Sequence, residues 1–350
     1  MTRSKSTSRL ATTFTLACLT IAISAAVQAA PITFKRTFKN TNAVQAGVSG
    51  IGTATGSIAV SGVSGTVTHA FLYWHGINNS GAGATYNNPT ISFNGVPVTG
   101  VSQGDASTNC WGAGSSRAFE ADVTSRVAGN GTYALGGFSS AAGYSTNGAS
   151  MIVVFDDGNS TNNRDYVFYT GNDSISADGA FPGDPSGWAA SLNSIGYRGG
   201  AARVTMHASD GQAFADGPVS FSTANGAQTI ADTNVLWDSR SVPNAGSSRA
   251  ADGLYDVHQF DVTSAFGGVT GPATLTMNAP AGGDCLALTA LVMDLEPGSA
   301  PFTTCAAEGI TGAKLSLCRQ ICEIDQTPTK LTGLIKLYMS TYRSAPACAN

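Results

Sequence analysis

Side chains that carry oxygen recur at every second position in one short polar segment. These residues are Asp157, Asn159, Thr161, Asn163 and Asp165. Because calcium binds several carboxylate, amide and hydroxyl oxygens from one loop, this spacing predicts a calcium site. The sixth position lacks the glycine of a helix-flanked calcium loop, and predicted strands flank the segment. The alternative interpretation is a polar connector held by Asx turns.

A serine nucleophile with a histidine base has no motif in this chain. The Gly-x-Ser-x-Gly elbow does not occur, and the segments around Ser49 and Ser64 lack its last glycine. The chain has four histidines: His69, His75, His207 and His258. Most of them fall in or beside predicted strands, so no residue is predicted to be catalytic. Because a triad is defined by geometry, a secreted hydrolase with a loop-borne site stays an alternative.

Two tryptophans are candidates for binding a sugar, since exposed aromatic rings can stack on carbohydrate. Trp111 and Trp188 lie in segments rich in Gly and Ser, which predicts loops. A carbohydrate-binding module is therefore a further alternative. Packing of both rings in the core is the competing interpretation. No organic cofactor is predicted, and calcium is the only candidate ion.

The first 29 residues have the layout of a secretory leader. Arg3, Lys5 and Arg9 precede an uncharged stretch from Leu10 to Ala26, and cleavage is expected after Ala29. The alternative, an uncleaved anchor, needs an apolar run of ~20 residues, and this one is shorter and contains Thr and Ser. We expect a secreted or periplasmic protein with no transmembrane anchor after leader removal.

The composition argues for a turn-rich β-protein that does not bind nucleic acid. Only 11% of residues are charged, the net charge is −4, and no Lys occurs between Lys39 and Lys314. Phosphate binding needs clustered Lys and Arg, so nucleic acid is excluded as a partner. The 42 glycines stand beside hydrophobic residues that make up 42% of the chain and recur in alternating runs.

Short strands separated by turns fill most of the chain. In the segment 66–74, alternation places Phe71 and Tyr73 on one face and Leu72 and Trp74 on the other. Two short apolar runs joined by Asn94-Gly95 predict a hairpin, because both residues tolerate positive φ. Further strands are predicted at residues 32–38, 90–93, 96–98, 118–123, 132–138, 150–155, 273–277 and 288–294.

The order of these elements repeats. Asp122-Val-Thr recurs as Asp261-Val-Thr at an offset of 139, and strands ending in Asp156 and Asp294 recur at an offset of 138. The repeat predicts two tandem antiparallel β-sandwiches of jelly-roll type, residues 30–157 and 158–296. We interpret each Asp-Val-Thr as a structural corner in which the carboxylate accepts a backbone N–H bond.

A small disulfide-bonded helical hairpin is predicted to follow. Residues 297–304 resemble a linker, and apolar periodicity predicts helices over 311–323 and 329–342 in the segment 305–350. Six cysteines remain after the leader: Cys110, Cys285, Cys305, Cys318, Cys322 and Cys348. Bridges from Cys318 and Cys322 to Cys305 and Cys348 suit the helix geometry, but their pairing stays open. A bond between Cys110 and Cys285 would join the two sandwiches.

Several motifs together resemble a known group of proteins. They include the strand around Trp74, the Phe93-Asn-Gly turn, Asp122-Val-Thr, Gly129-Asn-Gly-Thr-Tyr and the strand 150–155. The chain resembles bacterial and archaeal secreted or surface β-sandwich proteins of uncharacterised, adhesin-like type. The resemblance implies fold and location and transfers no active site. We therefore expect a non-catalytic adhesion, matrix or envelope protein that binds a surface glycan or a protein ligand.

Overall fold

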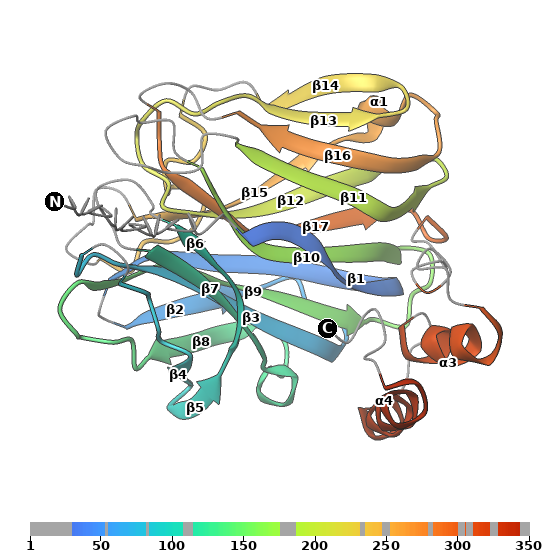
Figure 1. Cartoon of the computed structure of the whole chain (residues 1–350), viewed down its shortest axis with the longest axis horizontal. Coiled ribbons are helices and arrows are strands. Elements are labelled where there is room, and N and C mark those ends of the chain that lie inside the picture. Colours follow the sequence, from blue (N-terminus) through green and yellow to red (C-terminus); the bar gives the residue numbers. More distant parts are fainter. Residues whose placement is uncertain are drawn as a thin grey trace, which may run out of the picture.

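The computed structural model describes residues 30–52, 55–81, 84–107, 115–175, 187–231, 235–246, 253–278, 283–299, 305, 311–322 and 328–343. It contains a nine-stranded sheet and two four-stranded sheets. The two small sheets lie on opposite sides of the nine-stranded sheet, and a helical hairpin lies beside it (Figure 1). The predicted class, antiparallel sandwiches followed by a small helical hairpin, is confirmed.

The first sandwich encloses a core of alternating side chains from two antiparallel sheets. Its outer sheet has the order β2 (Gly56–Val60), β8 (Gly131–Gly136), β4 (Thr90–Phe93), β5 (Val96–Thr99). Its inner sheet contains residues 42–52 of β1 and then β9 (Tyr144–Asp156), β3 (Thr66–Asn78), β7 (Ser115–Asp122) and β6 (Val101–Ser107). The predicted turn joins β4 to β5, and Asn94 and Gly95 both have positive φ, 50° and 77°.

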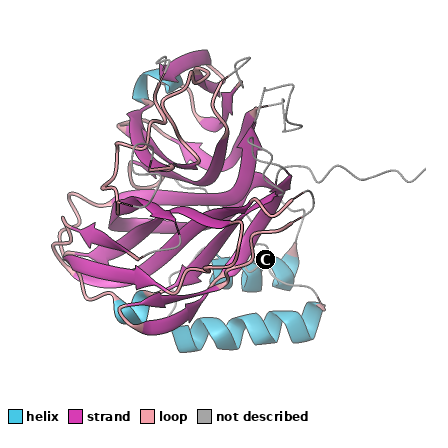
Figure 2. Cartoon of the chain, turned by 90° about the vertical axis from the view of Figure 1, so that its left-hand side faces the viewer, coloured by secondary structure: helices cyan, strands magenta, loops and turns pink. Residues whose placement is uncertain are grey.

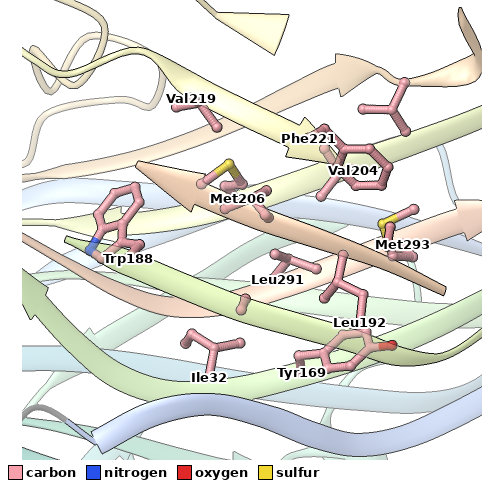
Figure 3. Close-up of a cluster of buried hydrophobic side chains, with 14 of the residues drawn as sticks. Ile32, Tyr169, Trp188, Leu192, Val204, Met206, Val219, Phe221, Leu291 and Met293 are labelled. Atoms are coloured by element: carbon pink, nitrogen blue, oxygen red, sulfur yellow. The ribbon is translucent and has the colours of Figure 1, made fainter. Parts of the chain in front are cut away.

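The second sandwich has the same construction. Its inner sheet contains residues 30–41 of β1 and then β10 (Arg164–Ile175), β17 (Leu286–Leu295), β12 (Ala202–Ser209) and β15 (Tyr255–Asp261). Its outer sheet has the order β11 (Trp188–Tyr197), β16 (Gly271–Met277), β13 (Val219–Thr223), β14 (Gly226–Ala231). Figure 3 shows the core between the two sheets, where Trp188, Phe221 and Leu291 are fully buried.

Strand β1 (Ala30–Gly52) belongs to both sandwiches. Its first half pairs with β10 up to Thr41, and its second half pairs with β9 from Asn42 onward. The strand bends at Asn40, which has a φ of 53°, and such bends let a strand change sheets. We predicted residues 30–41 within the first sandwich, whereas the structure places them in the inner sheet of the second. The pairing is non-local, so strand propensity could not reveal it.

Polar side chains from the predicted calcium segment hold this bend of β1. Asp165 accepts the backbone N–H of Asn40 at 2.9 Å and that of Gly298 at 2.8 Å. Asn163 donates to the carbonyl of Asn40 at 2.8 Å and accepts from Asn42 at 3.0 Å. The bend and the start of the linker are therefore tied to the same strand, β10.

The two Asp-Val-Thr corners have the same geometry. Asp122 accepts the N–H of Thr124 at 2.9 Å, and Asp261 accepts that of Thr263 at 2.8 Å. The threonine hydroxyls accept the N–H groups of Ala70 and Ala202 at 2.9 and 3.0 Å. A short helical turn follows each Asp: η1 (Thr124–Arg126) and α1 (Thr263–Phe266). These hydrogen bonds support the structural interpretation of both motifs.

The second pair of repeated aspartates does not share a role. Asp156 is exposed and accepts the N–H of Gly158 at 2.8 Å in an Asx turn. Asp294 is buried and forms ion pairs with Arg164 and Arg203. Asp156 and Asp294, which the repeat relates at an offset of 138, therefore lie in different environments.

The C-terminal segment folds as a hairpin of α3 (Gly312–Cys322) and α4 (Pro328–Tyr342). A disulfide joins Cys305 to Cys318, with Cα atoms 5.8 Å apart. Cys305, Cys318, Ile321 and Tyr338 form its small buried core. Helical periodicity had predicted both helices.

The Asp165 clamp gives a first prediction. Asp165→Ala is expected to lower the free energy of unfolding by about 2–4 kcal/mol, because two backbone N–H groups lose a buried acceptor. Urea unfolding measures this change. Asp157→Ala, in the exposed connector, is the matched control and should have a much smaller effect; equal losses in the two variants would contradict the clamp.

The hairpin gives a second prediction. Replacing Cys305 and Cys318 by Ser should unfold α3 and α4, since closing a loop of this size by a disulfide contributes about 3 kcal/mol and the core is small. The sandwiches should keep their melting temperature. Limited proteolysis and circular dichroism would measure both effects. A variant that retains full protease resistance in the hairpin, or loses the sandwiches as well, would contradict this separation.

Candidate functional site at the inter-sandwich interface

The inner sheets of the two sandwiches pack face to face, which we call the inter-sandwich interface. One face of each inner sheet covers its own sandwich core, and the other covers the opposite inner sheet. Leu72 and Trp74 lie in the core of the first sandwich, whereas Phe71 and Tyr73 lie in the interface. The alternation predicted for β3 is thus confirmed, and both of its faces are buried.

Aromatic rings form the apolar part of the interface. The centroid of Phe168 on β10 lies 5.2 Å from that of Phe38 and 6.1 Å from that of Phe71. The guanidinium of Arg36 lies 3.9 Å from the Phe71 ring centroid and forms an ion pair with Glu120 on β7. The first half of β1 is therefore fixed to the first sandwich even though it pairs with the second.

A serine and a histidine from opposite sandwiches form the central polar contact. Ser150 Oγ on β9 lies 2.7 Å from His207 Nδ1 on β12. His207 Nε2 lies 2.6 Å from Gln45 Oε1 on β1, and Tyr255 Oη lies 3.0 Å from Ser150 Oγ. Because an amide oxygen only accepts, Nε2 carries the proton of a neutral ring and Nδ1 accepts from Ser150. Tyr255 then donates to Ser150.

In a second serine–histidine pair the sandwiches are exchanged: the second sandwich supplies the serine and the first supplies the histidine. Ser209 Oγ on β12 lies 2.6 Å from His75 Nδ1 on β3. Asn147 donates to Ser209 at 3.1 Å and to Asp210 at 3.2 Å. The Ser209 hydroxyl can thus accept from Asn147 and donate its own proton to His75 Nδ1. In each pair, the histidine and the serine come from different sandwiches.

The two histidines occupy corresponding positions in the repeat. In the strand register, Phe71 pairs with Asp122 and Arg203 pairs with Asp261. His75 follows Phe71 by four residues, and His207 follows Arg203 by four. The duplicated corners thus place one histidine from each sandwich in the interface.

Burial keeps both rings neutral. His75, His207, Ser150 and Ser209 are all 0% exposed. Desolvation lowers the pKa of His75 to about 3, although the Asn172 side chain beside it favours the charged form. Desolvation also lowers the pKa of His207 to about 3. Neither ring can gain a proton near neutral pH without a large cost.

The geometry of Ser150 and His207 resembles a nucleophile and its base, but the surroundings do not suit catalysis. A general base works best when its pKa lies near the working pH. The pKa of His207 is far below that range, and its other nitrogen donates to an amide instead of a carboxylate. Since both side chains are fully buried, a substrate cannot reach the hydroxyl. The arrangement serves to hold two sheets together.

Buried aspartates fix the loops at one end of the second sandwich. Asp284 accepts the N–H of Gln212 at 2.5 Å, and Asp216 accepts that of Trp237 at 2.8 Å. Burial raises the pKa of Asp216 to about 6. Burial, with added repulsion from Asp210, raises the pKa of Asp284 to about 9. The folded state therefore retains these protons where the unfolded state loses them.

The predicted calcium segment is divided between two environments. Asp157 accepts the N–H of Asn159 at 2.9 Å, and Asn159 accepts that of Thr161 at 3.1 Å, in exposed Asx turns. Asn163 and Asp165 are buried and hold β1. These bonds are those of a polar connector. Among the described residues, no group of three or more His, Cys, Asp or Glu could hold a metal ion. Calcium binding stays a prediction.

The two tryptophans predicted to bind a sugar are Trp188, which the structure describes, and Trp111, which it does not. Trp188 was expected in an exposed loop, but it begins β11, is 1% exposed and packs edge-on against Trp237 with ring centroids 5.5 Å apart. That prediction was wrong, because a Gly/Ser-rich segment before a strand resembles a loop. Trp111 lies outside the described residues, so its sugar-binding role is untested.

The predicted disulfides are settled only in part. The bond between Cys305 and Cys318 is one of the predicted options. Cys285 is disulfide-bonded, but Cys110 and Cys348 lie outside the described residues, and the Cys322 side chain is not described. Pairing of Cys110 with Cys285 stays a prediction.

Sequence reasoning missed Ser150, Ser209, His75 and His207 as a group. The signal available was the burial of both faces of β3: apolar residues at every position from Ala70 to Trp74 are typical of a strand covered on both sides. Nothing in the sequence indicates which residue lies opposite His207, because its partner is 57 residues away.

The lowered histidine pKa values give a third prediction. The pKa of each histidine is lower in the folded state than its value of about 6.5 in the unfolded state. As pH falls, the unfolded state therefore takes up a proton before the folded state does. Stability is therefore lost as pH falls from about 6.5 to about 3, by up to about 1.4 kcal/mol per pH unit for each histidine. Asp216 and Asp284 have raised pKa values and act oppositely, losing their contribution as pH rises from 3.8 through about 6 and about 9.

Comparing variants isolates the histidine contribution. His207→Gln cannot titrate, so the pH dependence of its unfolding free energy between about pH 6.5 and 4 should be shallower than that of the parent by about 1.4 kcal/mol per unit. The aspartate contributions cancel in this difference. Urea unfolding at several pH values measures it, with His258→Gln as a control at a partly exposed histidine. Parallel profiles for parent and His207→Gln would contradict a buried neutral ring.

Comparisons with known proteins add no function. No protein-family model and no curated protein matches the chain. A chain from the atomic structure of Sulfolobus Turreted Icosahedral Virus is similar at 10% identity and a TM-score of 0.23, covering 87% of this chain and 98% of that chain. PNGase F, a glycosylasparaginase from Flavobacterium meningosepticum, is similar at 10% identity and a TM-score of 0.20, covering 74% and 98%. At these TM-scores, neither likeness carries an argument.

Proposed function

We propose that this protein is a non-catalytic exported component of a cell envelope, matrix or adhesive surface, whose two sandwiches act as one rigid body. The observation that carries the proposal is the burial of the serine and histidine side chains that could have carried out chemistry. Both serine–histidine pairs are fully buried and join the sandwiches. These pairs stabilise the packing of the two sandwiches and do not form a site that a substrate could reach.

The interface explains why two repeated modules would be needed. A single sandwich would expose Phe71, Tyr73 and His75 on one face of its inner sheet, and large exposed apolar faces promote association. Packing the two inner sheets against each other covers both faces within one chain. Because β1 pairs with both, separating the sandwiches would require breaking one of its two ladders.

Export is supported by the sequence and by the disulfide. The leader layout of residues 1–29 and the Cys305–Cys318 bond both favour an oxidising compartment. The low fraction of charged residues and the resemblance to secreted or surface β-sandwich proteins favour the same location. The partner we propose is a surface glycan or a surface protein, with calcium as a candidate ion at the connector.

A fourth prediction follows for chemical reactivity. The purified protein should not react with a fluorophosphonate probe, because Ser150 is buried and its histidine is a weak base. Ser150→Ala should therefore label to the same extent as the parent. Labelling of Ser150, or turnover of an ester or polysaccharide that Ser150→Ala abolishes, would contradict a non-catalytic protein and favour the hydrolase.

A glycan array in parallel separates the remaining alternatives. Saturable capture of one glycan class without turnover would favour a carbohydrate-binding module. Saturable binding to whole cells or matrix that survives glycan removal would favour a protein ligand. A Trp188→Phe variant serves as a control, since a buried ring should not change glycan binding in a folded protein.

A further inference from the structure

The connector between β9 and β10 contains a short motif that the proposed scaffold role does not use. Asn159-Ser160-Thr161 fits the pattern Asn-x-Ser/Thr, in which x is any residue except proline, and this pattern is the acceptor for N-linked glycosylation. A transferase needs an asparagine side chain that it can reach, so the folded structure discriminates between copies of the pattern. The chain contains four copies, which begin at Asn78, Asn130, Asn159 and Asn172.

Three of these four asparagines are held by the fold. Asn172 is 0% exposed within β10, and Asn78 is 6% exposed at the end of β3. Asn130 is exposed, but its side chain is bound at both ends, because Oδ1 accepts the N–H of Val63 and Nδ2 donates to the Val63 carbonyl, each at 2.8 Å. Thr132, the hydroxyl residue of the same copy, belongs to β8. A glycan cannot reach any of these three amides without disturbing the fold.

Asn159 differs from the other three in exposure and in hydrogen bonding. Asn159, Ser160 and Thr161 are all exposed, and Figure 2 shows the loops of the chain around the outside of the stacked strands. Oδ1 of Asn159 accepts the N–H of Thr161 at 3.1 Å and the Thr161 hydroxyl at 2.7 Å. Nδ2 of Asn159 donates to no residue in the described part of the chain. The nitrogen that would carry a glycan is therefore not held by the fold.

The turn around Asn159 presents both halves of the motif together. Asp157 accepts the N–H of Asn159 at 2.9 Å and the side-chain amide of Asn162 at 2.8 Å. Gly158, with a φ of 75°, lets the chain turn between Asp157 and Asn159. The asparagine amide and the threonine hydroxyl, which define the motif, consequently lie side by side on an exposed Asx turn of the folded protein. Access to them requires no unfolding.

We propose that Asn159 is the acceptor of an N-linked glycan, transferred from a lipid-pyrophosphate-linked oligosaccharide. In the transfer, the bond between the anomeric carbon of the glycan and the pyrophosphate oxygen breaks, and a bond from that carbon to Nδ2 forms. Nδ2 releases one proton, and the lipid pyrophosphate is the leaving group, so the step needs no oxidant or reductant. The hydrogen bond from the Thr161 hydroxyl to Oδ1 withdraws electron density from the amide, which favours the loss of that proton.

Glycan transfer to Asn159 rests on the proposed export, because the glycan would be added where an exported chain meets the lipid-linked donor. It does not rest on the absence of catalysis. The added group would be bulky and hydrated, and it would project from an exposed connector without entering the inter-sandwich interface. Among the residues that the structure describes, no helix has the length and apolar composition to span a membrane.

A fifth prediction tests the acceptor by mass spectrometry. The full chain is purified from cells that naturally make it and is cleaved on the N-terminal side of aspartates. This cleavage gives one peptide of residues 157–164, whose single Asn-x-Ser/Thr motif begins at Asn159, and another of residues 122–155, which contains Asn130. The first peptide should be heavier by one glycan and the second should be unmodified. Fragmentation that leaves the glycan attached should assign it to Asn159.

Variants made in the same cells assign the modification to the motif. Asn159→Gln and Thr161→Ala should lose the added mass completely, whereas Thr161→Ser should keep it, since serine retains the hydroxyl. Thr132→Ala is the matched control, because it removes the motif at Asn130 without removing the bonds of that asparagine to Val63. This control should carry the glycan as the parent does. Circular dichroism verifies the fold of every variant.

Three outcomes would overturn this proposal. They are an unmodified peptide 157–164, a glycan that remains in Asn159→Gln, and a glycan attached to the hydroxyl of Ser160 or Thr161. Fractionation of the same cells separates this failure from a failure of the proposed function. An unmodified chain found outside the cytoplasm contradicts the glycan alone, whereas a chain retained in the cytoplasm contradicts the proposed export.

Discussion

The structure depends on one interaction: polar side chains that the two inner sheets bury between them bond to one another across the interface. An unpaired buried polar group costs about 1–3 kcal/mol, so each bond across the inter-sandwich interface contributes to its stability. A neutral histidine offers one donor and one acceptor, and a serine can supply either. In the pairs of His207 with Ser150 and His75 with Ser209, the serine Oγ lies 2.7 and 2.6 Å from the histidine Nδ1.

Strand β1 connects the two sandwiches covalently and by hydrogen bonds, because it pairs with both inner sheets. Its first half extends the inner sheet of the second sandwich, and its second half extends that of the first. Gln45, from the second half, completes the contacts of His207 on the opposite sandwich. The strand, the bend at Asn40 and the histidine network therefore depend on one another. Separating the sandwiches would therefore disrupt all three.

Local sequence signals predicted much of the fold. Alternation gave the two faces of β3, Asn94-Gly95 gave a hairpin, and apolar periodicity gave the two C-terminal helices. The hairpin and the helices are fixed by contacts near in sequence, and the alternation follows from the two-residue period of any strand. The crossing of β1 was not predictable in this way, since its second half is rich in Gly and Ala and acquires its order from partners about a hundred residues away.

The site was predicted less well than the fold, for a related reason. The five-residue calcium pattern treated side chains as one loop, yet Asn163 and Asp165 turn toward β1 while Asp157 remains in the connector. Trp188 had polar neighbours in sequence and apolar neighbours in space. Ser150 and His207 carry no motif, because their meeting follows from the packing of two sheets. Duplicated corners, once recognised, could have related His75 to His207.

The protonation state of the two buried histidines in solution tests the closed inter-sandwich interface most directly. Nitrogen-15 NMR of the imidazole rings, recorded from about pH 7 to about pH 4.5, reports charge and tautomer for each ring. We expect His75 and His207 to stay neutral throughout, with the proton of His207 on Nε2. A titration of either ring near the ordinary value of about 6.5 would contradict a dry, closed interface and reopen the case for an accessible site.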